Sequence, residues 1–158
     1  MDDGLLARLV AEEQELVFPR FTSDDALAIG LSIVEAAKVR GVAIACDVSR
    51  SGQQLFHWSS DGCSPDHDQW LQRKTRVVQR FHMSSAQLGE RLRANGLTLE
   101  ARYGVSFAEY APAGGAFPIR IRDVGVVGAV AVSGLSRDED HALVTDAIRA
   151  HLVRTGAL

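Results

Sequence analysis

The residues best suited to chemistry begin with a group of cations in the segment that opens at Pro65. Projected as a helix, this segment places its large apolar side chains in one arc, namely Trp70, Leu71, Val77, Val78 and Phe81. Lys74 falls in the middle of that arc, and Arg73, Arg76 and Arg80 lie together on the adjoining face. Arginines one turn apart suit carboxylates or phosphates, and a lysine among apolar groups is costly to bury without a partner charge. The pattern therefore predicts either an anion site or a solvated cationic face along which Lys74 extends to water.

Further polar residues surround the start of that helix. His57 and Trp58 precede it on an expected strand, and Asp66, His67 and Asp68 form its first turn. An isolated Asp-His-Asp run lacks the ligand spacing of zinc or calcium sites, and first-turn aspartates are favoured by the helix dipole. We therefore expect no metal centre here.

Asp140 interrupts the apolar pattern of the last helix in the same way. It projects into the arc of Val144 and Ile148, with His141 at the edge of that arc. It also lies near the N-terminal end, where the helix dipole favours a negative charge. Two interpretations stay open: a partly buried acid satisfied by backbone donors or an arginine, or an Asp140–His141 pair at the rim of a pocket.

Small residues mark other positions of interest. Gly114 and Gly115 permit a backbone conformation or a close approach that a side chain would block. Ser133 lies in a Val-Ser-Gly run that lacks the glycine pair of a nucleophile elbow, so hydrolase chemistry is not indicated. The glycines between residues 125 and 128 lead into a strand, which argues against a nucleotide phosphate loop.

Periodicity and capping residues predict the elements that must position these side chains. Helices are expected over about residues 5–16, 22–41, 65–80, 84–95 and 136–156. Alternating patterns predict a hairpin of strands 42–49 and 54–59, followed by strands 117–122 and 126–133. Residues 97–116 are ambiguous. This order predicts an α/β (α+β) fold, in which helices cover both faces of a mainly antiparallel sheet of about five strands.

Length, composition and charge exclude several classes of protein. The 158 residues, of which 46% are hydrophobic and 23% charged, are typical of one globular domain spanning 1–158 and not of a disordered chain. A net charge of -3 gives no global attraction to nucleic acid, so we expect no nucleic-acid partner.

Segments that would direct the chain to a membrane are not expected either. The longest apolar run, 124–132, is too short for a span, and the acidic start Met1-Asp2-Asp3 is unlike a signal peptide. Cys46 lies in an apolar run and Cys63 in a polar loop, a difference that favours a reducing, cytoplasmic compartment over a disulfide framework.

Several longer motifs resemble uncharacterised protein family 0303 when they are taken together. They are DVSRSGQQLFH at 47–57, SPDHDQWLQRK at 64–74, GGAFP at 114–118, GVVGAVAVSG at 125–134 and EDH at 139–141. The resemblance covers nearly the whole chain. Through the Gly-Gly…Pro and Val-Ser-Gly…Asp elements, that family is similar in turn to the GlcG-like haem-binding and haem-degrading domains.

The resemblance implies a profilin-like, three-layer α-β-α sandwich, a closed homo-oligomer built from dimers and a haem-related activity. With no c-type haem signature in the sequence, haem would be held non-covalently, with any axial ligand drawn from His, Cys, Tyr or Met. The candidate histidines are His57, His67, His82 and His141, but the resemblance does not extend to His82, to which we assign no role. Carried over motif by motif, the resemblance singles out His57, Trp58, Asp66, Trp70, Arg73, Lys74, Gly114, Gly115, Ser133, Asp140 and His141.

Three hypotheses about function follow. In the first, the chain is a cytoplasmic protein that binds haem, with or without degrading it; Arg73, Lys74 and Arg76 pair with the propionates and a histidine lies near the iron. In the second, it is a non-catalytic, ring-forming binding or adaptor protein, in which Lys74 and Asp140 pair across the core or a subunit interface. In the third, it is an enzyme that acts on a small carboxylated metabolite through the same cations.

Overall fold

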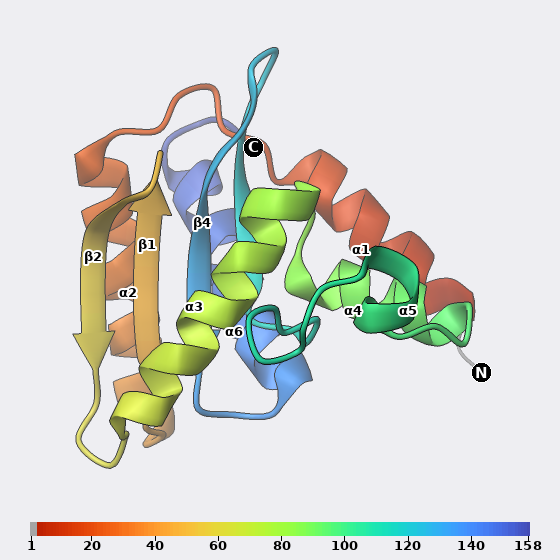
Figure 1. The fold of residues 1–158 in the computed structure, drawn as a ribbon. Coiled ribbons are helices and arrows are strands. Elements are labelled where there is room, and N and C mark those ends of the chain that lie inside the picture. Colours follow the sequence, from red (N-terminus) through yellow and green to blue (C-terminus); the bar gives the residue numbers. More distant parts are fainter. Residues whose placement is uncertain (1–2) are drawn as a thin grey trace.

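The computed structural model describes residues 3–158, in which helices cover both faces of a sheet (Figure 1). The helices are α1 (Asp3–Glu15), α2 (Ser23–Arg40), α3 (Pro65–Phe81), α4 (Ser85–Ala94), α5 (Leu99–Tyr103) and α6 (Arg137–Arg154). The strands are β1 (Ala45–Arg50), β2 (Gln53–Ser59), β3 (Ala116–Ile121) and β4 (Gly125–Ser133). The predicted α/β class and the two covering layers of helices are confirmed.

The sheet has the strand order β2-β1-β4-β3, and each neighbouring pair is antiparallel. The described residues form four strands in this sheet, so the expected number of about five is corrected. The ambiguous segment 97–116 supplies no strand before Ala116 because local capping favours a helix there: Thr98 accepts a hydrogen bond from Ala101 N–H, and Gly104 ends α5 with φ +68°.

The two faces of the sheet differ in side-chain size. Large apolar residues of the strands, such as Val48, Phe117 and Val130, face α2 and α6 and form the main core with them. The other face presents mainly alanines, among them Ala45 and Ala131, to Leu71 and Val78 of α3 in a second core cluster. Small residues on that face let α3 approach the strands closely, which brings its central side chains to the sheet.

Capping residues begin the helices where the sequence predicts. Thr22 and Asp25 form a reciprocal capping box at α2, and the hydroxyls of Ser84 and Ser136 accept hydrogen bonds at the starts of α4 and α6. Ser64 precedes Pro65 at the start of α3. The first turns of α3 and α6 are thereby placed at one end of the sheet, beside the end of β4 (Figure 1).

Among the described residues, no helix combines the length and the apolar character that a membrane span requires. Met1 and Asp2 of the acidic start lie outside the described residues.

Candidate functional site

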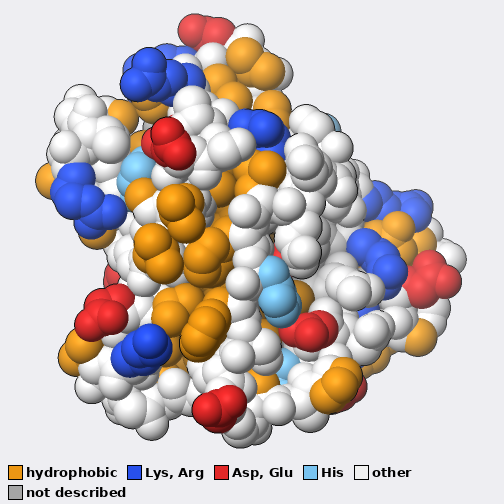
Figure 2. Space-filling model, turned by 90° about the vertical axis from the view of Figure 1, so that its left-hand side faces the viewer, with side chains coloured by type: hydrophobic (Ala, Val, Ile, Leu, Met, Phe, Trp, Pro, Cys, Tyr) orange, Lys and Arg blue, Asp and Glu red, His pale blue; other side chains and the backbone are white. Residues whose placement is uncertain are grey.

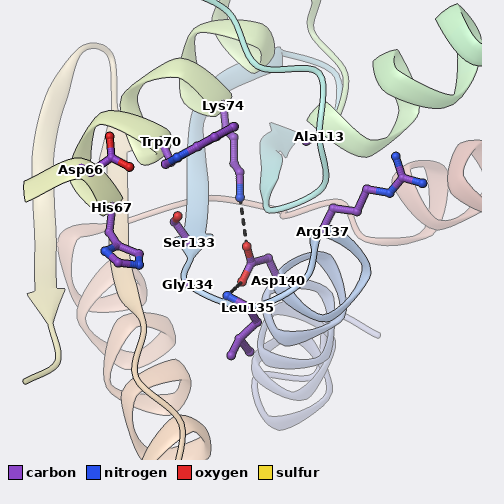
Figure 3. A pocket seen from close by; sticks show the side chains of 10 residues that line it. All are labelled: Asp66, His67, Trp70, Lys74, Ala113, Ser133, Gly134, Leu135, Arg137 and Asp140. Carbon is purple, nitrogen blue, oxygen red and sulfur yellow. Dashed lines mark hydrogen bonds and ion pairs between the residues drawn. The ribbon is translucent and has the colours of Figure 1, made fainter. Parts of the chain in front are cut away.

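A pocket of about 300 Å³ opens between α3, the end of β4 and the start of α6; we call it the α3–α6 pocket (Figure 3). It is lined by Asp66, His67, Trp70, Lys74, Ala113, Ser133, Gly134, Leu135, Arg137 and Asp140. Five of the expected site residues thus come together here: Asp66, Trp70, Lys74, Ser133 and Asp140. They come from three separate stretches of the chain, so the fold has to assemble them.

Lys74 lies at the inner wall of this pocket and is only 3% exposed. Its Nζ donates to the Asp140 carboxylate over 3.0 Å and to the Val132 carbonyl oxygen over 3.1 Å. An ammonium group has three donors, so one N–H of Lys74 is left beyond these two bonds. The lysine that breaks the apolar arc of α3 is therefore buried and paired, and it does not extend to water.

Asp140 is buried as well and joins two parts of the chain. One carboxylate oxygen accepts from Lys74 and the other accepts from the Leu135 backbone N–H at 3.0 Å (Figure 3). Both sequence interpretations hold in part, because Asp140 is satisfied by a backbone donor and a cation and also lines the pocket. The cation is a lysine rather than an arginine.

Gly115 makes room for this ion pair. Its φ is +136°, and a Cβ atom there would lie 2.6 Å from Lys74 Nζ and 2.5 Å from the Val132 carbonyl oxygen. At Gly114 a Cβ would lie 2.3 Å from the Arg137 carbonyl oxygen. The pair of glycines therefore lets the start of β3 approach both Lys74 and the first turn of α6, as the sequence predicts.

Burial and pairing act in opposite directions on the two charged groups. Burial lowers the pKa of the Lys74 ammonium, and the nearby Asp140 carboxylate opposes that shift. Burial likewise raises the pKa of Asp140, against the effects of Lys74 and of the Leu135 N–H. Perturbed titratable groups at the wall of a pocket are common features of functional sites.

His67 presents only one of its ring nitrogens to a ligand. Its Nδ1 accepts a hydrogen bond from the Ser64 backbone N–H at 3.0 Å, which closes the capping box of α3. In the neutral imidazole this bond leaves the proton on Nε2, so Nε2 is a donor. His67 thus suits an acceptor such as a carboxylate better than a metal ion, which would need the Nε2 lone pair.

The expected cationic ridge does not open into the α3–α6 pocket. Arg73 donates to the Phe107 carbonyl oxygen, and its guanidinium lies 4.3 Å and 4.4 Å from the ring centres of Trp70 and Phe107. Arg76 donates to the Glu109 carbonyl oxygen at 3.2 Å. These arginines hold the loop that follows α5, and the ammonium group at the inner wall of the pocket is that of Lys74.

The remaining expected residues lie elsewhere. His57, on β2, has its two ring nitrogens 3.5 Å and 3.6 Å from Asp47 and Asp68. Trp58 lies under the ammonium group of Lys38 from α2. No cluster within residues 3–158 has the composition and spacing of a metal site.

His141 lines a different pocket, and its Nε2 lies 2.6 Å from the Glu12 carboxylate. Five residues of the α3–α6 pocket were not predicted from the sequence to line a ligand site, and His67 was a candidate only as an iron ligand; the five are His67, Ala113, Gly134, Leu135 and Arg137. One signal in the sequence could have indicated the orientation of His67. It stands three residues after Ser64, which is the spacing of a capping box.

Comparison with known proteins identifies the family. The model of the HbpS-like haem-degrading proteins matches residues 21–149. The chain belongs to the HbpS-like family. A UPF0303 protein of Streptomyces coelicolor is 48% identical to this HbpS-like chain over 143 residues, which is 90% of each sequence. The predicted resemblance to uncharacterised protein family 0303 is therefore confirmed. The HbpS-like match indicates a haem-related role for the family as a whole.

Solved structures of HbpS-like fold agree with the described architecture. The crystal structure of the Ybr137w protein has a TM-score of 0.88 and 30% sequence identity, and the match covers 95% of this chain and 88% of that one. A crystal structure of a PduOC–haem complex has a TM-score of 0.70 at 18% identity, covering 82% of this chain and 94% of that one. At this low sequence identity, the match to the PduOC–haem complex shows a similar fold only.

Proposed function

We propose that the chain binds haem non-covalently and that the α3–α6 pocket receives a carboxylate edge of the porphyrin. The observation that carries the proposal is the buried Lys74 ammonium, which keeps one N–H beyond its two bonds, at the wall of a pocket in an HbpS-like chain. The haem complex of a protein of similar fold supports the choice of ligand.

The lining residues fit the carboxylates of haem better than its iron. Lys74, the Nε2–H of His67 and the Ser133 hydroxyl are all donors on this pocket, and a carboxylate accepts several such bonds. A volume of about 300 Å³ is at the lower end for small-molecule sites, so most of a porphyrin ring would lie outside this pocket. His67 would supply an iron ligand only by giving up its bond from Ser64. We therefore assign no axial ligand in this pocket.

Titration with hemin, followed through the Soret band, tests this proposal. We expect saturable binding of hemin and comparable binding of iron-free protoporphyrin, because the contacts proposed are to the carboxylates. His67→Ala removes one charge-assisted hydrogen bond and should weaken binding about tenfold. His57→Ala is the matched control, since His57 lies on β2 outside the pocket.

The outcomes separate the hypotheses. Unchanged hemin affinity in His67→Ala, or no saturable shift in the parent protein, would overturn the proposal. Saturable binding of succinate or citrate without binding of hemin would favour a small carboxylated metabolite. Addition of ascorbate or peroxide to a hemin complex would then distinguish simple binding from ring opening, through bleaching and release of iron.

A second candidate function, self-assembly, is favoured by one side of the molecule. Leu27 and Leu31 of α2 are 49% and 54% exposed, and Trp58 of β2 lies beside that helix at 41% exposure. Figure 2 faces this side and shows hydrophobic side chains gathered between acidic and basic ones. β2 is also an edge of the sheet, with β1 as its sheet neighbour among the described strands. Exposed apolar patches and open edges mark interaction surfaces.

We propose a second copy of the chain as the occupant of this surface. On the exposed face of α2, Asp24 lies at one end and Lys38 at the other, with Leu27 and Leu31 between them. A two-fold axis across this face places each Asp24 near the partner's Lys38, whereas a parallel copy would oppose like charges. Light scattering should show that Leu31→Asp, but not the matched exposed change Val153→Asp on α6, shifts the protein to smaller species. An unaltered size would contradict this assignment.

A further inference from the structure

A second pocket, larger than the first and mostly apolar, lies where α1 and α4 meet the start of α6. Its volume is about 380 Å³, and we call it the α1–α4 pocket. Small and aliphatic residues supply most of its wall: Leu5, Leu9, Ala86, Gly89, Pro112, Ala113 and Gly114. Neither the proposed haem site nor the self-assembly surface uses this cavity.

The walls of the α1–α4 pocket are held in place by polar bonds behind them. The buried Glu13 carboxylate accepts from the Ser84 backbone N–H at 3.1 Å and from the Ser84 hydroxyl at 2.9 Å, which ties α1 to the start of α4. Glu12 pairs with His141 and so ties α1 to α6. A Cβ atom at Gly89 would lie 2.2 Å from the Pro112 carbonyl oxygen, so α4 is also in close contact with that loop. The elements that bound the cavity are thus tied to one another.

The charged rim of the pocket offers one cation to a ligand. Arg137 lines both pockets, and Figure 3 shows its guanidinium extending away from the Lys74–Asp140 pair, toward α4. Within residues 3–158 its guanidinium has no hydrogen bond or ion pair. The other cations are engaged, since Arg93 pairs with Glu90 and His141 contacts Glu12. Asp138 and Glu90 contribute negative charge to the same rim.

We propose that the α1–α4 pocket binds an amphipathic carboxylate, with its aliphatic chain against Leu5 and Leu9 and its carboxylate on Arg137. Burial of each methylene group against the apolar wall favours binding, and a planar guanidinium suits a carboxylate through two parallel hydrogen bonds. The acidic groups at the rim disfavour ligands with several negative charges, so the preferred ligand carries a single carboxylate. This site is distinct from the haem site, with which it shares Ala113 and Arg137.

Calorimetric titration with octanoate, and with octanol as its uncharged analogue, tests the inference. We expect saturable octanoate binding that Arg137→Gln weakens about tenfold, the effect of one lost charge-assisted contact. Arg154→Gln, an exposed arginine in the last turn of the same helix, should bind octanoate as the parent does. Octanol should bind more weakly than octanoate to the parent and equally to parent and Arg137→Gln.

A second variant fills the cavity without touching the charge. Ala86 is half-buried on α4 and lines the pocket, so Ala86→Phe should abolish octanoate binding. Circular dichroism checks that this variant stays folded. His67→Ala should leave octanoate binding unchanged, which distinguishes this pocket from the proposed haem site. The inference is overturned if octanoate does not saturate, if Arg137→Gln retains full affinity, or if folded Ala86→Phe still binds.

Discussion

The ammonium of Lys74 and the carboxylate of Asp140 meet at 3.0 Å at the end of the sheet, although their helices cover its opposite faces. Lys74 extends past Gly115 and the end of β4, and Asp140 reaches it from the first turn of α6 (Figure 3). The two side chains thus connect the outer layers of the sandwich directly. Burying such a pair costs desolvation, which the mutual attraction of the two charges and their further hydrogen bonds have to offset.

Breaking this pair on one side only should strongly destabilise the fold. Lys74→Met leaves the Asp140 carboxylate buried without its cation, and we expect a loss of about 3–5 kcal/mol in the free energy of unfolding. Lys74→Met combined with Asp140→Asn should lose less than the sum of the single changes, because each single change leaves one buried charge without its partner and the double change leaves none. Urea denaturation of the four proteins gives the coupling.

Glu139→Gln provides the control for that cycle. Its carboxylate pairs with Arg40 at 3.3 Å with both side chains exposed, so the change should cost less than about 1 kcal/mol. If Lys74→Met cost no more than Glu139→Gln, the interlayer pair would have no structural weight.

Gly115→Ala should lower the free energy of unfolding more than a glycine substitution that causes backbone strain alone. The methyl group would overlap Lys74 Nζ and the Val132 carbonyl oxygen in addition to requiring φ +136°. Gly104→Ala is the matched control, because Gly104 also has positive φ but a methyl group added there would meet no atom within 4 Å. We expect about 1–2 kcal/mol for the control and about 1–3 kcal/mol more for Gly115→Ala in urea melts. Equal losses would show that Lys74 and β4 move aside freely.

The interlayer pair was predictable from sequence because each partner breaks a helical pattern. Lys74 and Asp140 both project into apolar arcs, and burying one charge requires the other. Local patterns also predicted the helix caps and the β1–β2 hairpin, since both depend on neighbouring residues.

Features that depend on distant segments were less predictable. The ridge of Arg73 and Arg76 was visible, but its carbonyl partners lie more than thirty residues away, in a loop without periodicity. The direction of Arg137 depends on how α6 meets α4, which no local pattern encodes. Segment 97–116 was ambiguous for a different reason: its short helix α5 depends on the local cap at Thr98, and the periodicity around it is weak.

The two cysteines should react with thiol reagents at very different rates. Burial, and then the neighbouring Asp47, raise the pKa of the Cys46 thiol, whereas Cys63 is partly exposed. We expect one thiol to react quickly with a disulfide reagent in the native protein and both to react in denaturant. Cys63→Ser should remove the fast reaction, and its persistence in that variant would contradict the burial of Cys46.

Asp25 should account for part of the loss of stability in acid. Burial alone would raise its pKa, but bonds from the Thr22 backbone N–H at 2.7 Å and from His151 at 2.9 Å lower the pKa below its ordinary value. The unfolded chain therefore takes up this proton at a higher pH than the folded one does. The stabilisation is present above about pH 4, the ordinary value for Asp, and is lost as the pH falls through the lower, folded-state pKa.

Asp25→Asn should accordingly lower the free energy of unfolding at pH 7 and reduce its slope below about pH 4. Asp24→Asn, at the neighbouring exposed position, serves as the control for the general effect of removing an acid from the first turn of α2. Urea melts between pH 7 and pH 3 measure both quantities. If the free energy of unfolding fell as steeply with pH in Asp25→Asn as in Asp24→Asn, the bonds from Thr22 and His151 would not favour the Asp25 carboxylate over its protonated form. The acid sensitivity would then arise at another carboxyl group.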